Sequence, residues 1–266
     1  PPRRRDGGTR CRGARSFPIP PGPSVADIAT EIHHDVVPEI LRGCWRRAWI
    51  EFGDGRRDDT GVVMWLQTER SMVDVRIPAD RGGRAEFDGC ISIADCTIEQ
   101  LRAIATSDGS CGYTECSSVV DSGGRRSATA EWHTRGQGVC FQPISAFPEP
   151  GRMTWNDDGT VMHERAPSGA YIEEWRLVPG SRDPLTAGKD CYRAGNIAVL
   201  VRDRTVPIPR QARLADLLDE FADDRAIVDG LLDCEFTIAE RLDGHWTVTA
   251  STLPWLEGTK ADVDLH

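Results

Sequence analysis

The sequence predicts an all-β fold, an antiparallel β-barrel accompanied by a few short helices. Three consecutive strands are expected between Gly43 and Pro78, because β-branched and aromatic residues fill the runs GCWRRAWIEF, VVMWLQT and MVDVRIP. A turn rich in Gly and Asp, GDGRRDDTG, separates the first two runs and is typical of a hairpin. Hydrophobic residues make up 39% of the 266-residue chain, which is enough to fill a core.

Strand signals return in the middle and at the end of the chain. The runs SATAEWHTRG and YIEEWRLV are expected to be strands, and GRMTWNDDGTVMHERA predicts a hairpin that turns at Asn156–Gly159. Further on, NIAVLVRDRTVPIP is expected to hold a strand or two. The closing run CEFTIAERLDGHWTVTAST predicts two strands about a Leu-Asp-Gly-His turn.

Three segments carry helix signals. Ser24 is a good N-cap for a short helix over 24–32. Thr97 and Gln100 match a capping box, in which each side chain bonds the backbone N–H of the other, so a helix is predicted over 97–105. Leucines at helical spacing predict an amphipathic helix over 212–231 with its charged face toward solvent.

Composition divides the chain into three parts. Residues 1–23 combine Arg, Gly and Pro without periodicity and are expected to be a disordered tail. Residues 24–179 hold the first barrel, with a cysteine-containing insertion at about 88–127. The run PGSRDPLTAGKD, which begins at Pro179, has the composition of an interdomain break, so 180–266 is expected to be a second, smaller barrel-like unit with one helix.

Charge and hydropathy exclude several kinds of partner. The net charge is −10 and the pI is about 5.1, so the chain lacks the basic surface that nucleic acid or an anionic membrane requires. No run approaches the roughly 18 apolar residues of a membrane span, and no apolar region follows the basic start as in a secretory signal. We expect a cytoplasmic protein, and the odd number of nine cysteines favours reduced thiols.

Neither of two possible metal motifs has the full ligand pattern. His33 and His34 are adjacent without a third ligand nearby, and a solvated helix end is the expectation there. The four thiols at Cys90, Cys96, Cys111 and Cys116 could close a zinc site, but they lack a C-x-x-C pair. We therefore expect no metal and treat zinc as the alternative.

Signatures of the common catalytic folds are also missing. The sequence has no G-x-S-x-G elbow, no phosphate loop, no G-x-G-x-x-G after a strand and no H-E-x-x-H. These absences argue against serine-hydrolase, P-loop and Rossmann chemistry, and no cofactor is expected.

Short motifs along the chain carry a family resemblance. They are Trp65-Leu66, Asp74-Val75-Arg76-Ile77-Pro78, Met153-Thr154-Trp155-Asn156-Asp157 leading through Glu164 to Tyr171-Ile172-Glu173-Glu174-Trp175, and the Leu-Pro-Trp segment at Leu253. In addition, Gly43-Cys44-Trp45 at the start of the first strand is the Gly-x-Trp opening that is common in lipocalin-like chains. In these the chain resembles bacterial members of the two-barrel, lipocalin-like (calycin-like) family first described in yeast as a partner of a casein-kinase-type enzyme. The resemblance implies two antiparallel lipocalin-like barrels in tandem and no established catalytic residues.

Strand alternation gathers tryptophans and charges on single faces. The sets are Trp45, Arg47, Trp49 and Glu51; Trp65 and Gln67; Asp74 and Arg76; and Tyr171, Glu173 and Trp175. The opposite faces of the first three strands are apolar. Either the apolar faces fill the barrel, or the Trp-polar faces line a cup in which an internal Asp74–Arg76 ion pair orients a ligand.

If the Trp-polar faces line a cup, this cup predicts a function. We predict a binding protein for a small amphipathic or acidic ligand, contacted by Trp45, Arg47, Trp65, Gln67, Asp74, Arg76, Tyr171 and Trp175. One alternative is a cofactor-independent lyase or isomerase in the same cup, with His133 or Glu173 as proton shuttle and Arg76 holding an anionic group. The other, suggested by the family resemblance, is a protein-interaction module that presents a flat patch of Trp to a protein partner.

Overall fold

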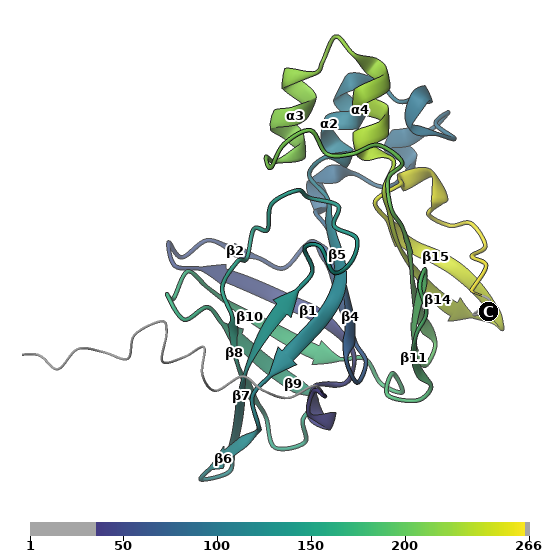
Figure 1. Ribbon diagram of the computed structural model, residues 1–266. Coiled ribbons are helices and arrows are strands. Elements are labelled where there is room, and N and C mark those ends of the chain that lie inside the picture. The colour runs from purple at the N-terminus through teal and green to yellow at the C-terminus, as the bar shows by residue number, and fades with distance from the viewer. Residues whose placement is uncertain (1–35, 264–266) are drawn as a thin grey trace, which may run out of the picture. The chain divides into compact units, whose positions relative to one another are not determined.

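The computed structural model describes residues 36–263, and antiparallel β-strands make up the larger part of their regular secondary structure (Figure 1). The tail expected at 1–23, the helix expected at 24–32 and the His33–His34 pair lie outside the described residues. None of the described helices is long and apolar enough to cross a membrane.

Eight strands close into an antiparallel barrel, because each pairs with the next along the chain and the last pairs with the first. They are β1 (Gly43–Phe52), β3 (Val62–Gln67), β4 (Ser71–Ile77), β5 (Asp108–Cys116), β7 (Arg125–His133), β8 (Gly151–Trp155), β9 (Val161–Arg165) and β10 (Tyr171–Leu177). Two short strands, β2 (Arg57–Asp58) and β6 (Val120–Ser122), add to β1 and β7. The predicted antiparallel barrel is confirmed, and its closure removes the unpaired edges of an open sheet.

The second sheet contains five antiparallel strands in chain order. They are β11 (Leu185–Ala187), β12 (Cys191–Ala194), β13 (Ile197–Arg202), β14 (Glu235–Leu242) and β15 (His245–Ser251). Within this sheet β11 and β15 each pair with one neighbour, so the sheet is open and a second barrel is not confirmed. The boundary expected near Pro179 falls between β10 and β11.

Short helices accompany the sheets. The predicted capping box begins α2 (Ile98–Ile104), where Gln100 N donates to Thr97 Oγ1 at 3.3 Å and Thr97 N donates to Gln100 Oε1 at 2.8 Å. The single helix predicted over 212–231 is wrong, since the chain forms α3 (Leu214–Glu220) and α4 (Arg225–Leu232). The side chain of Asp224 accepts a hydrogen bond from Ile227 N at 3.3 Å and so starts a new helix. The single-turn 3-10 helices are η1 (Glu39–Leu41), η2 (Ala79–Arg81), η3 (Arg84–Phe87), η4 (Ile93–Asp95) and η5 (Pro254–Leu256).

The apolar faces of β3 and β4 point out of the barrel. Leu66, Val73 and Val75 are fully buried in one hydrophobic cluster that also contains Phe236 of β14 and Leu214 of α3. The opposite faces of the same strands enclose a second cluster, inside the barrel, that includes Trp45, Trp65 and Trp175. The Trp-polar faces therefore form the barrel interior, because the second sheet and the helices cover the apolar exterior.

The prediction that Trp45, Arg47, Trp49 and Glu51 share one face of β1 is wrong, because the strand contains a β-bulge. The pairing of β1 with β10 shifts between Arg47 and Trp49, so Arg47 lies opposite the inward Trp175 whereas Trp49 lies opposite Glu174. Beyond the bulge Ile50 is buried, and Glu51 is exposed. Trp49 and Glu51 therefore leave the face of Trp45 and Arg47, because one extra residue in a strand reverses the alternation that follows it.

The barrel strand β5 has glycines where the second sheet approaches. Part of the segment expected to be an insertion, 108–116, is this strand, whose sequence DGSCGYTEC lacks aliphatic β-branched residues. A Cβ at Gly109 would lie 2.5 Å from Cγ of the Phe236 ring, so glycine is what lets β14 pack against the barrel wall.

We predict that Gly109→Ala destabilises the protein by about 1–3 kcal/mol, the usual cost of overpacking a core. Urea unfolding followed by circular dichroism measures this loss. Gly83→Ala is the matched control, because a Cβ there meets no atom closer than 3.8 Å and Gly83 has a negative φ. Adding Phe236→Leu is expected to recover part of the loss. Equal stabilities of the two alanine variants would contradict the close approach of β14.

Candidate functional site

One end of the barrel is closed by apolar side chains. Trp45 Nε1 donates to the carbonyl oxygen of Leu41 at 2.7 Å, which ties the first strand to η1. Gln67 is fully buried, and its Oε1 accepts from Thr114 Oγ1 at 2.7 Å. Trp45 and Gln67, both predicted to bind a ligand, have structural partners here and do not line the cavity described next.

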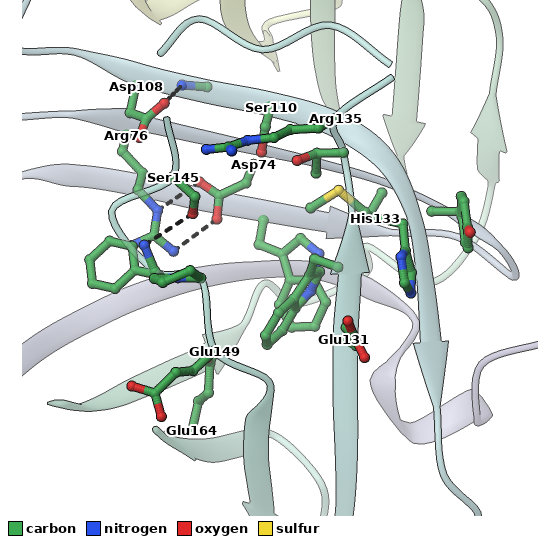
Figure 2. A pocket seen from close by; sticks show the side chains of 18 of the residues that line it. Asp74, Arg76, Asp108, Ser110, Glu131, His133, Arg135, Ser145, Glu149 and Glu164 are labelled. Atoms are coloured by element: carbon green, nitrogen blue, oxygen red, sulfur yellow. Dashed lines mark hydrogen bonds and ion pairs between the residues drawn. The ribbon is translucent and has the colours of Figure 1, made fainter. Parts of the chain in front are cut away.

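A cavity of about 390 Å³ lies on the inner side of several barrel strands (Figure 2). Its wall comes from strands β3, β4, β5, β7, β9 and β10 and from the segment 134–149 that follows β7. The predicted ligand-binding residues on this wall are Trp65, Asp74, Arg76, Tyr171 and Trp175. The closed barrel thus brings together residues that are up to about a hundred positions apart in the sequence.

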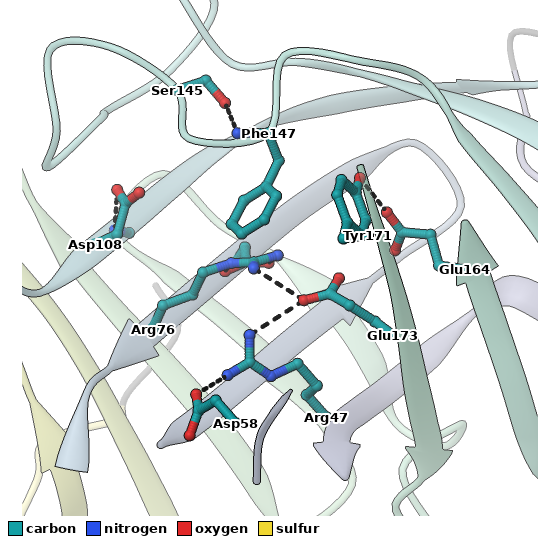
Figure 3. A network of polar contacts seen from close by, with 11 residues as sticks. Arg47, Asp58, Arg76, Asp108, Ser145, Phe147, Glu164, Tyr171 and Glu173 are labelled. Carbon is teal, nitrogen blue, oxygen red and sulfur yellow. Dashed lines mark hydrogen bonds and ion pairs between the residues drawn. The ribbon is translucent and has the colours of Figure 1, made fainter. Parts of the chain in front are cut away.

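The predicted Asp74–Arg76 pair is present, and it is bidentate. Arg76 Nε donates to Asp74 Oδ1 at 2.9 Å, and Arg76 Nη2 donates to Oδ2 at 3.1 Å. Arg76 Nη1 also donates to Glu173 Oε1 at 3.2 Å. The Phe147 ring covers the guanidinium, whose Cζ lies 4.4 Å from the ring centroid (Figure 3). Two carboxylates and an aromatic ring therefore fix the orientation of Arg76.

Glu173 connects this pair to a second arginine. Its Oε1 also accepts from Arg47 Nη1 at 3.1 Å, and Arg47 Nη2 donates to Asp58 Oδ2 at 2.8 Å. Glu173 is fully buried, and its Oε2 has no hydrogen-bond partner within 36–263. Burial by itself would lower the pKa of Arg76, but the adjacent carboxylates of Asp74 and Glu173 raise it well above its ordinary value. Arg76 is thus a permanent cation in this site.

Glu164 is a buried carboxyl that the motif search did not propose as a site residue. It lines the cavity, and Tyr171 Oη donates to its Oε1 at 3.0 Å (Figure 3). Burial and the nearby Glu173 charge raise the pKa of Glu164 to about 8. Burial and the Glu164 charge also raise the pKa of Tyr171. The one sequence signal for an inward Glu164 is the alternation of β9, which puts Glu164 on the same face as the buried Met162.

Asp108 is a second carboxyl that sequence reasoning missed. It lies opposite Arg76 in the β4–β5 pairing and therefore faces inward, as Figure 2 shows. Its Oδ1 accepts from the backbone N–H of Gly109 at 2.8 Å. Burial raises the pKa of Asp108 to about 6, although the Arg76 charge opposes this shift. The site thus holds two carboxyls with separated pKa values.

His133 lies on the outward side of β7. Its neighbour Trp132 packs inward against Trp65, with ring centroids 5.7 Å apart, so alternation puts His133 on the opposite face, at the margin of the cavity. There the imidazole stacks on Tyr113 at 4.7 Å, and its Nε2 is 3.5 Å from Glu115 Oε2. The two predicted proton shuttles are therefore separated, because Glu173 belongs to the internal ion-pair network.

Two indole groups on the cavity wall have unused hydrogen-bond donors. The rings of Trp65 and Trp175 form a T-shaped pair with centroids 6.0 Å apart. Both rings are 1% exposed, and neither Nε1 has an acceptor among the described side chains and backbone. Buried donors are normally satisfied, so these two N–H groups are exceptions, as is that of Trp155, which is buried in the same cluster but does not line the cavity.

The cysteines do not gather into a metal centre. Cys90, Cys96, Cys111 and Cys116 are buried free thiols. Across the described range, no group of three or more His, Cys, Asp or Glu side chains has an arrangement that could hold a metal ion. Burial raises the pKa of the Cys96 and Cys116 thiols to about 12, which makes them weak nucleophiles at neutral pH.

We predict that Arg76→Met lowers the free energy of unfolding by about 3–5 kcal/mol, because it leaves the carboxylates of Asp74 and Glu173 without their shared cation. Thermal and urea unfolding measure the loss. Adding Glu173→Gln is expected to restore more stability than adding Asp74→Asn, since the Glu173 side chain is 1% exposed and that of Asp74 is 13% exposed. No coupling in either double-mutant cycle would contradict the buried network.

The pKa of Glu164 predicts a pH dependence of stability. A carboxyl whose folded pKa of about 8 exceeds its ordinary value of 4.5 stabilises the fold while it is protonated, and this contribution is lost as the pH rises from about 4.5 through 8. Glu164→Gln keeps a neutral side chain. Between pH 6.5 and 8.5 it should lose at least about 1.4 kcal/mol less stability than the wild type, the equivalent of one pKa unit.

Urea unfolding at several pH values in this window tests the prediction. The window lies above the pKa of Asp108, which is about 6, so that carboxyl contributes little to the slope. Parallel pH profiles for wild type and Glu164→Gln would show that Glu164 titrates normally in the folded state.

Comparisons of the chain with protein-family models, curated proteins and solved structures find no significant match. The resemblance to the two-barrel lipocalin-like family therefore stays a prediction from short motifs. A proposal of function therefore rests on the cavity and the side chains around it.

Proposed function

We propose that the barrel binds a small amphipathic molecule in its internal cavity. The observation that carries this proposal is the combination, in one cavity of about 390 Å³, of indole walls and a fixed set of charged groups. Sites for small molecules have volumes of roughly 300–1,000 Å³, apolar walls and a few oriented polar groups. The cavity has the volume and the indole wall of such a site, and its lining carries more polar and charged side chains than is usual.

The polar groups of the cavity are preorganised. Arg76 makes three hydrogen bonds to carboxylates, and the Glu173 carboxylate that it contacts is also held by Arg47. The segment 134–149 that follows β7 is held at two points. Cys140 pairs with Ser110 in an isolated antiparallel β-bridge, and Glu149 accepts hydrogen bonds of 3.0 and 2.6 Å from Ser168. A ligand would therefore lose little free energy to ordering the site.

The architecture supports a lipocalin-like barrel as part of this proposal. Trp45 of the Gly43-Cys44-Trp45 motif packs at the closed end, bonded to η1, which leaves the ligand space at the other end. In this proposal the second sheet is a cover for the barrel wall rather than a second ligand-binding barrel.

The low exposure of the tryptophans argues against the protein-interaction module. All eight tryptophans lie within 36–263, and none of them is exposed. Because a flat Trp patch for a partner requires exposed indoles, we retain the internal cavity as the functional site.

A second candidate function, proton-transfer catalysis, is favoured by one observation. Glu164 and Asp108 line the same cavity as Arg76, with pKa values of about 8 and 6. Carboxyls with separated pKa values are the usual pattern of an acid and a base in one site. In a lyase or isomerase of this kind, Glu164 and Asp108 would replace His133 and Glu173 as the proton-transfer groups.

We predict that Ser110→Phe, which fills the cavity from its wall, weakens the binding of small aromatic alcohols and amines by at least about tenfold, a loss of roughly 1.4 kcal/mol. Isothermal titration calorimetry measures the affinity, and thermal melting checks the fold. Ser122→Phe is the control, because Ser122 lies on the exposed strand β6. Equal affinities of the two variants, or no binding by the wild type, would overturn the proposal.

A further inference from the structure

We propose that the ligand of this cavity is an organic cation, whose ammonium group binds beside Asp108 and whose apolar body contacts the indole rings. This inference rests on the proposed binding function and adds the charge class of the ligand. It departs from the acidic ligand that the arginines in the sequence suggest.

The arginines inside the barrel have no charge left for an acidic ligand. Arg76 is shared between Asp74 and Glu173, and Arg47 between Glu173 and Asp58. This network contains three carboxylates and two guanidinium groups, so it is formally negative before any ligand enters. A ligand carboxylate would have to displace one of these ion pairs.

Two inward-facing carboxyls of the cavity wall, Asp108 and Glu164, by contrast form no ion pair among the described residues. Within the described range, Asp108 accepts a hydrogen bond only from the Gly109 backbone N–H, and Glu164 accepts one only from Tyr171. Glu164 is 4% exposed, and both carboxyls line the cavity. The remaining guanidinium on the wall, that of Arg135, belongs to an exposed residue and makes no ion pair within 36–263. A buried carboxyl is stabilised when a positive charge binds beside it.

The aromatic wall suits a cation as well. Trp65, Trp132 and Trp175 line the cavity, and the negative faces of indole rings attract ammonium groups. The site already uses this interaction, since the Arg76 Cζ lies 4.4 Å from the Phe147 centroid and 5.9 Å from that of Trp175. A ligand ammonium would add a further cation–π contact to those that Arg76 makes with Phe147 and Trp175.

The unused indole donors supply a second, independent indication of a ligand. The Nε1 atoms of Trp65 and Trp175 are buried and without an acceptor in the described part of the chain. A bound cation does not satisfy them, so the ligand should also carry an oxygen acceptor. An amine with a hydroxyl or ether oxygen at its other end fits both requirements.

A series of three ligands that differ in charge but little in shape tests the inference. Tyramine carries an ammonium group, tyrosol carries a hydroxyl in its place, and 4-hydroxyphenylacetate carries a carboxylate. Titration calorimetry at pH 7.5, above the pKa of Asp108, should give an affinity for tyramine at least tenfold higher than for tyrosol, with 4-hydroxyphenylacetate binding most weakly.

Substitutions test whether the ligand ammonium group binds at Asp108. Asp108→Asn should reduce tyramine affinity at least fivefold and leave tyrosol affinity within twofold of wild type. Glu51→Gln is the matched control, because it removes one exposed carboxylate of β1 outside the cavity and should change neither affinity. Thermal melting confirms that each variant is folded.

The outcomes separate the two proposals. Tyrosol or 4-hydroxyphenylacetate binding as tightly as tyramine, or an Asp108→Asn variant with unchanged selectivity, would overturn the cationic ligand and leave small-molecule binding in place. If none of the three ligands binds, both the cationic ligand and small-molecule binding in this cavity are overturned.

Discussion

The structure depends on which face of β3 and β4 is covered by the rest of the chain. Their apolar faces pack against Phe236 and the helices, in a cluster where Leu66, Val73 and Val75 are fully buried. Burying such side chains contributes roughly 1.5–3 kcal/mol each, so this contact fixes the register of the barrel strands. The Trp-polar faces are then directed into the barrel, and a set of charges becomes internal as a consequence of how the exterior is covered.

Internal charge determines the character of the cavity. Charges in a water-poor barrel must pair, and the pairs formed by Arg47 and Arg76 use carboxylates from β2, β4 and β10. Because more carboxyls than guanidinium groups face inward, Glu164 and Asp108 are left to hydrogen bonds alone, and their pKa values rise. The shortage of internal cations, more than the presence of Arg76, gives the site its selectivity in our proposal.

Local patterns in the sequence predicted much of the barrel, and the failures have physical causes. Alternation placed Asp74 beside Arg76 and gathered the indoles, because both depend only on neighbours two residues apart. Alternation failed on Trp49, since a bulge depends on the pairing partner in β10. The alternation pattern also failed to predict strand β5. Its Gly109 is required by the close approach of the Phe236 ring, which lies 127 residues away in the chain. Glu164 was missed for a related reason, since a lone Glu in a strand gives no sign that its pKa is raised by burial and by Glu173.

Several groups at the cavity have features that cost stability. Glu164 is buried without an ion-pair partner, and Glu173 Oε2 and the indole N–H groups of the cavity-lining Trp65 and Trp175 lack a partner among the described residues. Each such group costs of order 1–3 kcal/mol when it stays buried and unpaired. A fold selected only for stability would replace buried carboxyls with apolar side chains of similar size. Glu164 lines the cavity and Glu173 holds the cavity-lining Arg76, so the buried carboxyls with incomplete pairing lie at the cavity, and this is the strongest physical reason to connect them with a ligand.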